Sequence, residues 1–158
     1  MHPTKNDLTG NIRKSMAALL NARLADALDL QLQTKQAHWN VRGENFIALH
    51  ELFDALYKEV TDHVDSIAER ITALGGTALG TVQAVAKASQ LPAYPTNISD
   101  GRQHVDKLSS AFAAFGKATR AAIDEADEAG DKNTADLFTG ISRAIDKNLW
   151  FLEAHLGG

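Results

Sequence analysis

Only three prolines interrupt this chain of 158 residues, and their positions constrain the fold more than any other feature. Pro3 stands near the start, and Pro92 and Pro95 lie close together past the middle, so that two long stretches contain no proline. Both stretches are rich in Ala, Leu, Gln, Lys, Glu and Asp, which are all compatible with helix. The proline distribution therefore predicts an almost entirely helical protein.

Apolar residues in the first stretch recur at the three- and four-residue steps of an amphipathic helix. They predict helices over about 9–40 and about 46–74, with a turn at Gly43 between them and an end at Gly75 and Gly76. The apolar positions are Ile12, Met16, Leu19, Leu20, Leu24, Ala27, Leu28 and Leu32, then Phe46, Leu49, Phe53, Leu56, Val60, Val64, Ile67, Ile71 and Leu74.

The second half predicts two more long helices after a long connection. Residues 77–98 should hold a brief helix at roughly 81–89 and then a segment that its prolines keep irregular. The third helix should start with Ser99 as N-cap and run to about 129, and the fourth should follow a tight turn and end near Leu156. Short, long and short loops predict an all-α fold, a ferritin-like four-helix bundle with an extra short helix in the long connection. We expect a tail over 1–8 and one domain over 9–156.

Composition narrows the chemistry. The chain has no cysteine, which excludes disulfides, iron–sulfur clusters and thiolate zinc sites, so any metal must be bound by His, Asp or Glu. No apolar run approaches the ~20 residues of a membrane span, and the first residues lack the apolar core of a signal peptide, which predicts a cytoplasmic protein. The net charge of −4 argues against a surface that attracts nucleic acid everywhere and favours metal cations as ligands.

Five side chains in the first half could bind metal. His50 with Asp54, and Asp65 with Glu69, are spaced four residues apart, so each pair shares one face of the second helix. His38 lies six residues before position 44 and His50 lies six after it, so an antiparallel hairpin that turns there should place the two imidazoles side by side. The alternative is a solvated helix face next to a packed histidine.

These two pairs cannot meet within one chain, because positions 50 and 65 are roughly 22 Å apart along a helix. Two copies packed antiparallel about a twofold axis near residue 59 or 60 would bring His38, His50 and Asp54 of one copy to Asp65 and Glu69 of the other. Such a nitrogen and oxygen ligand set suits Fe(II), Mn(II) or Zn(II). The spacing thus predicts metal sites shared between two subunits.

Residues 35–76 resemble the segment shared by Dps proteins, the DNA-binding proteins from starved cells. The resemblance continues through GGTALGT, AYPTNI and DKNLWFLEAHL, so it covers nearly the whole chain. The residues that carry it are His38, Trp39, His50, Asp54, Asp65 and Glu69.

This resemblance implies a ferroxidase, an oxidoreductase that oxidises Fe(II) with hydrogen peroxide, in a dodecameric shell that stores ferric mineral and protects DNA from oxidative damage. It implies di-iron centres at the twofold interfaces. His38, Asp65 and Glu69 would bind one iron, and His50 and Asp54 with the shared Glu69 would bind the other.

Several further residues acquire expected roles from the family. Trp39 would lie near the iron as an electron donor, or else be a core aromatic. Asp131 and Asp136 would line an acidic pore through which iron enters, or else belong to a solvated helix end. Arg70 and Asp146 would pair across an interface or lie on the surface. The remaining histidines, expected to be structural or solvated, are His2, His63, His104 and His155.

DNA binding is the family property from which this sequence departs. It is usually credited to a mobile, lysine-rich tail that binds phosphates through counterion release. Here the residues before and at the start of the first helix offer only Lys5, Arg13 and Lys14, and the sequence closes on HLGG. The alternative function, a nucleoid protein that coats DNA with its metal sites secondary, is therefore less well supported than iron oxidation.

Overall fold

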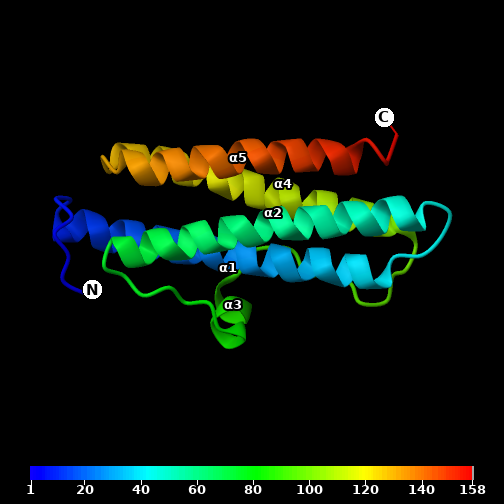
Figure 1. Ribbon diagram of the computed structural model, residues 1–158, viewed down its shortest axis with the longest axis horizontal. Coiled ribbons are helices and arrows are strands. Elements are labelled where there is room, and N and C mark those ends of the chain that lie inside the picture. Colours follow the sequence, from blue (N-terminus) through cyan, green and yellow to red (C-terminus); the bar gives the residue numbers. More distant parts are fainter. Residues whose placement is uncertain (158) are drawn as a thin grey trace.

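The computed structural model describes residues 1–157, and its helices follow the chain in the order shown in Figure 1. Within that range the helices are α1 (Gly10–Asn40), α2 (Phe46–Ala73), α3 (Val82–Ala88), α4 (Gly101–Glu128) and α5 (Lys132–Glu153). The four long helices and the short α3 confirm the fold expected from the sequence. None of the helices among these residues is both long and apolar enough to cross a membrane.

The long helices form two antiparallel hairpins, α1 with α2 and α4 with α5, stacked on each other (Figure 1). The Arg42 N–H donates to the Ser99 carbonyl over 2.8 Å, so α4 begins beside the turn between α1 and α2. The connection after α2 must therefore return along the whole bundle before α4 starts. This crossover makes the topology ferritin-like rather than simply up and down.

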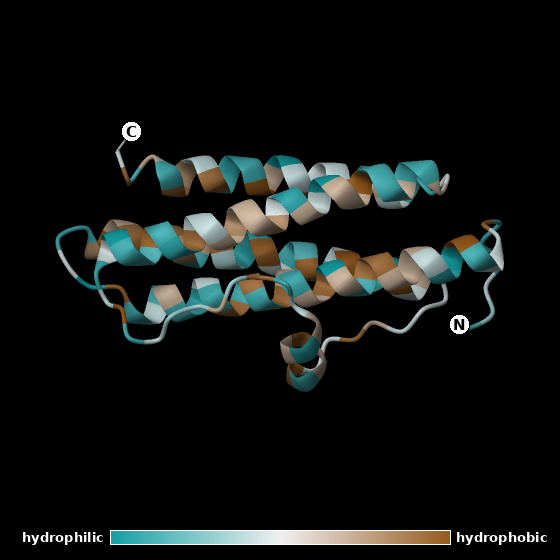
Figure 2. Cartoon of the chain, turned by 180° about the vertical axis from the view of Figure 1, so that it is seen from behind, coloured by the Kyte–Doolittle hydropathy of each residue, from teal (hydrophilic) through white to brown (hydrophobic). Residues whose placement is uncertain are grey.

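The core runs the length of the bundle between the two hairpins. Hydrophobic and hydrophilic residues alternate along each long helix, as one buried stripe requires (Figure 2). Four phenylalanines are completely buried, and each contributes roughly 1.5–3 kcal/mol through its burial. They are Phe53, Phe112, Phe115 and Phe138.

Side chains at the helix N-termini explain where the helices begin. Thr9 caps α1 and Thr81 caps α3, close to the helix starts expected at about 9 and 81. The expected cap of α4 at Ser99 is wrong by one residue, because Asp100 Oδ1 accepts the Gln103 N–H over 3.1 Å. The last long helix, α5, ends at Glu153 rather than near Leu156.

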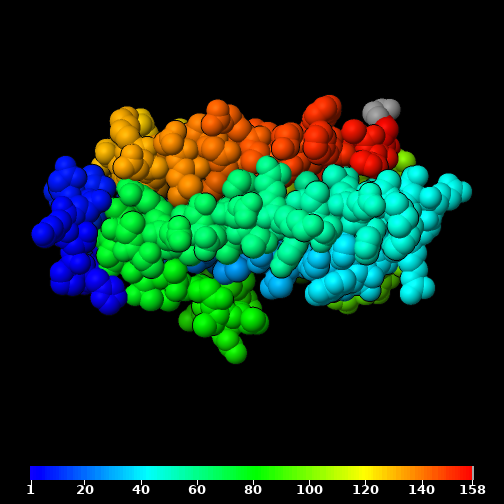
Figure 3. Space-filling view, in the orientation of Figure 1, coloured from blue at the N-terminus to red at the C-terminus, as the bar shows by residue number. Residues whose placement is uncertain are grey.

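One apolar position of α1 does not face the core. Leu32 is 53% exposed and borders a groove of about 480 Å³ between α1 and α3, with Leu28 and Val85 beside it. In the space-filling view α3 stands out from the edge of an otherwise even surface (Figure 3). The chain thus leaves apolar side chains uncovered on this side of α1.

Candidate metal centre

Two histidines face each other where α1 ends and α2 begins. The rings of His38 and His50 are stacked with centroids 3.7 Å apart and planes at 24°. His38 Nδ1 lies 2.8 Å from the His50 carbonyl oxygen, and His50 Nδ1 lies 2.9 Å from the His38 carbonyl oxygen. Because a carbonyl can only accept, each Nδ1 carries the proton and each Nε2 keeps its lone pair. The hairpin therefore delivers two nitrogen donors side by side, as expected.

The turn between the helices sets this pairing. Residues 41–45 connect α1 to α2, with Gly43 at φ +110°, a conformation that favours glycine, and with Val41 buried below it. The Phe46 ring lies 5.1 Å from that of His50 and limits its movement. Both imidazoles are consequently oriented by the fold before any ligand arrives, as metal-binding histidines usually are.

Asp54, one turn beyond His50, is held between two lysines. Its carboxylate oxygens lie 2.7 Å from Lys35 Nζ and 2.8 Å from Lys58 Nζ. Hydrogen bonds from these two ammonium groups hold the pKa of Asp54 well below its usual range, so the carboxylate is ionised. Neither lysine was predicted as a partner of Asp54. The i, i+4 spacing of Lys58 could have revealed one of them, but Lys35 is brought in by the packing of α1 on α2.

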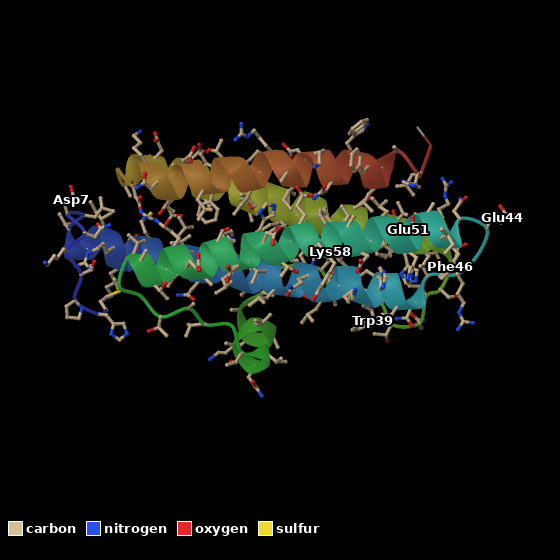
Figure 4. All side chains as sticks on the ribbon, viewed as in Figure 1. Asp7, Trp39, Glu44, Phe46, Glu51 and Lys58 are labelled. Carbon is tan, nitrogen blue, oxygen red and sulfur yellow. The ribbon has the colours of Figure 1, made fainter. Side chains whose placement is uncertain are left out.

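Asp65 and Glu69 are exposed on the outer side of α2. Helical spacing places them on the same face as His50 and Asp54, a face marked by Lys58 in Figure 4. Within residues 1–157 of one chain, no three His, Asp or Glu side chains gather closely enough to hold a metal ion. A single chain therefore presents two imidazoles, with a carboxylate one helical turn away, at one end of this face, and two exposed carboxylates nearer its other end; we call the first group the candidate half-site.

Sequence comparisons identify the family to which the chain belongs. Residues 17–158 match the ferritin-like domain family. The DNA protection during starvation protein of Agrobacterium fabrum (strain C58) is 51% identical over 155 residues, which are 98% of this chain and 96% of that protein. The chain belongs to the Dps family.

Solved Dps structures share the fold over the whole chain. DpsA14 from Streptomyces coelicolor superposes with a TM-score of 0.93 at 35% identity, covering 98% of this chain and 92% of that one. The Dps protein of Vibrio cholerae O1 superposes with a TM-score of 0.92 at 29% identity, covering 99% and 98%. That protein is described as a member of a superfamily of ferritin-like diiron-carboxylate proteins.

Trp39 follows the first histidine of the half-site and points away from the core. It is 66% exposed, at the end of α1 (Figure 4). The alternative that Trp39 is a core aromatic is therefore wrong for the isolated chain. Its role as an electron donor stays a prediction.

The acidic residues named for a pore have different surroundings. Asp131 is 2% exposed, its carboxylate lies 2.7 Å from Arg70 Nη2, and it caps α5 through the Thr134 N–H. These bonds give Asp131 a structural role in place of the expected pore role, because a carboxylate that is already paired and buried is poorly accessible to cations. Asp136 is exposed and keeps its expected role as a prediction.

The expected family pair of Arg70 and Asp146 does not form within the chain. Arg70 binds Asp131, and its Nε also donates to Thr134 Oγ1 over 3.0 Å. Asp146 instead lies 2.7 Å from Arg120 Nη1 on α4. Both residues thus tie neighbouring helices of the same bundle together.

Arg13, one of the few basic residues near the start of the chain, is used in packing. Its Nε donates to the Leu8 carbonyl over 3.2 Å, and its Nη1 donates to the Leu74 carbonyl over 3.1 Å. The guanidinium therefore joins the chain before α1 to the end of α2. Arg13 is therefore less available to bind a phosphate than the sequence suggests.

Proposed function

We propose that this chain is the subunit of a shell, a dodecamer by analogy with the Dps family, that oxidises Fe(II) and stores the ferric product. The proposal rests on the paired imidazoles of His38 and His50. Each is fixed by the other's backbone carbonyl with its Nε2 free, which is how metal-binding histidines are usually oriented. Two such donors next to an ionised carboxylate suit a divalent iron substrate.

A second copy would complete each site. If two α2 helices pack antiparallel about an axis near residue 59 or 60, Asp65 and Glu69 of one copy lie beside the histidines of the other. The uncovered apolar side chain of Leu32 supports contact on this face, because its neighbour Gln31 hydrogen-bonds Thr61, close to the proposed axis. An axis there would bury apolar surface that the single chain leaves in water.

The protein's own groups account for the reaction we propose. His38 and His50 bind Fe(II) through Nε2, and the carboxylates of Asp54, Asp65 and Glu69 neutralise the charge of two adjacent ions, Glu69 by bridging them. Each Fe(II) supplies one electron and hydrogen peroxide accepts two, so a pair of ions, with two protons from the solvent, reduces one peroxide to two water molecules and leaves two Fe(III). Removing Fe(II) and peroxide together would protect DNA without requiring the protein to bind it.

Replacing a carboxylate that only the second copy can supply tests this function. Asp65→Asn should slow peroxide-dependent Fe(II) oxidation at least about tenfold, since it removes a charged ligand from every site. Fe(II) would be titrated anaerobically into the purified assembly, peroxide added, and the iron bound per subunit recorded with the assembly mass.

Asp62→Asn is the matched control, because Asp62 is also an exposed carboxylate of α2, one turn before Ser66 and outside the proposed ligand set. It should leave both iron stoichiometry and rate as in the parent protein. An Asp65→Asn shell of normal mass that oxidised Fe(II) at the parent rate would overturn the proposal.

A further inference from the structure

A tyrosine and a histidine form a hydrogen-bonded pair inside the bundle, away from the candidate iron ligands. Tyr94 Oη, in the connection before α4, lies 2.6 Å from Nδ1 of His104. Their rings are nearly parallel, at 16° with centroids 6.0 Å apart, and His104 is 1% exposed. Burial raises the pKa of Tyr94 and lowers that of His104, so at neutral pH a neutral phenol donates to a neutral imidazole.

Aromatic rings connect this pair to the candidate metal centre. The ring of His104 lies edge-on to that of Phe53, with centroids 6.5 Å apart. Phe53 is three residues beyond His50 on α2, so the two are neighbours along one side of the helix. His50 in turn stacks on His38. A line of rings therefore leads from the proposed iron site to Tyr94.

We infer that the partly buried Tyr94 and the buried His104 form a redox pair, in which Tyr94 gives up an electron while its phenolic proton passes to His104 Nδ1. A phenol becomes a strong acid when it loses an electron, so a buried tyrosine is oxidised readily only where a base already accepts its proton. His104 Nδ1 is such a base at hydrogen-bond distance.

The surroundings of His104 act in opposite directions on the imidazolium that this transfer creates. Its Nε2 is buried and has no hydrogen-bond partner within residues 1–157. The backbone carbonyls of Asn40 and Ile98 and the charge of Asp100 all raise the pKa of His104, against the larger opposing effect of burial. They would stabilise the positive ring for as long as the tyrosine remains oxidised.

The electron acceptor would be a hydroxyl radical formed from hydrogen peroxide. This step rests on the proposed function. When one Fe(II) alone reduces hydrogen peroxide, it yields Fe(III), hydroxide and a hydroxyl radical. That radical takes an electron from Tyr94 and becomes hydroxide, the phenolic proton moves to His104, and a neutral tyrosyl radical faces an imidazolium. A further Fe(II) then returns an electron, the proton moves back, and Fe(III) is formed.

The other tyrosine of the chain provides an internal comparison. Tyr57 has Lys35 Nζ 4.6 Å from its ring centroid, and a nearby cation disfavours loss of an electron. No hydrogen bond to a histidine engages Tyr57 among the described residues. If the hydrogen bond between Tyr94 and His104 served only to hold the connection against α4, the two tyrosines would be oxidised equally readily.

Photo-oxidation of the iron-free, assembled protein tests the inference independently of iron chemistry. Photogenerated tris(bipyridine)ruthenium(III) would supply the oxidant, and electron paramagnetic resonance of frozen samples would detect the radical. We expect a neutral tyrosyl signal that is lost in Tyr94→Phe and retained in Tyr57→Phe. His104→Gln should lower its yield several-fold and remove the shift in the largest g value that a hydrogen-bonded radical shows.

Loss of the signal in Tyr94→Phe could also arise if that variant misfolded. The control is the Tyr57→Phe variant labelled with ring-deuterated tyrosine, because Tyr94 is then the only tyrosine and is chemically intact. Collapse of the proton hyperfine splitting assigns the radical to Tyr94. No tyrosyl signal in that sample, or an equal yield with and without His104, would overturn the redox pair.

A second arm uses substoichiometric Fe(II) followed by peroxide. The same radical should appear in the parent protein and be absent in Tyr94→Phe. A radical seen on photo-oxidation but not with iron would reject the link to iron chemistry and leave the redox pair supported. If the parent protein itself did not oxidise Fe(II), that result would instead count against the proposed function.

Discussion

At the scale of single residues, Asp54 combines two roles that oppose each other. Its carboxylate is kept ionised by Lys35 and Lys58, which favours binding of a cation. The same two ammonium groups occupy the oxygens that a metal ion would need. Lys58 is 73% exposed and can swing into water, whereas Lys35 is 21% exposed and packs over the Tyr57 ring. We therefore expect Lys58 to be the one displaced when iron binds.

Lys58→Gln should consequently strengthen binding of a redox-inert divalent cation. With one competing charge removed, the affinity for Zn²⁺ should rise a few-fold, an effect that weakens as salt is added. Calorimetric titration of the assembled protein at low and high ionic strength measures this. Lys87→Gln on α3, an exposed lysine outside the centre, should bind Zn²⁺ like the parent. Equal or weaker binding by Lys58→Gln would show that Lys58 does not compete for the carboxylate.

At the scale of helices, the start of α5 is anchored more firmly than a helix cap alone requires. Asp131 caps the helix through Thr134 and also binds Arg70 from α2, so one carboxylate fixes the end of one hairpin to the other. Lys132 and Asp127 pair in the same turn, but both are exposed. The acidic residues around this turn therefore differ sharply in what they contribute to stability.

Asp131→Ala should lower the free energy of unfolding by about 3 kcal/mol, because it removes the cap and leaves Arg70 without its buried partner. Asp127→Ala should lower it by less than about 1 kcal/mol, as is usual for an exposed ion pair. Urea denaturation of both variants gives the comparison. Similar losses for the two would mean that Asp131 has no special structural role.

At the scale of the whole molecule, the isolated chain is stable as a bundle yet incomplete as a site. Its polar half-sites lie on one face of α2, and the apolar groove between α1 and α3 lies uncovered beside them. The second copy that we propose on that face would account for both features. Assembly and iron chemistry would then depend on the same contact.

Mixed assemblies can show whether each site draws on two chains. Subunits carrying His50→Ala and subunits carrying Asp65→Ala should each be inactive alone. In a dimer of one of each, one site receives both changes and the other receives neither. Random pairing in an equal mixture makes about half of the dimers mixed, so Fe(II) oxidation should return to about a quarter of the parent rate. Dissociation, mixing and reassembly followed by a peroxide assay measures this. Failure of the mixture to regain activity would place each complete site within one chain.

Several features could be predicted because they depend on residues close in sequence. Thr9 and Thr81 begin helices where local capping rules place them, and Gly75 follows the end of α2. The stacking of His38 on His50 followed from their equal distances to one turn. In each case the partner is a few residues away or related by simple helical arithmetic.

The sequence by itself thus determined the helices, their order and the candidate residues that we propose as iron ligands, because periodicity and spacing are local properties of a helical chain. Only the tertiary structure decided how those residues are used. It brought Lys35 to Asp54, buried Asp131 against Arg70 and joined Tyr94 to His104. These contacts depend on which helix faces pack together and on how the long connection returns, and no local pattern records either.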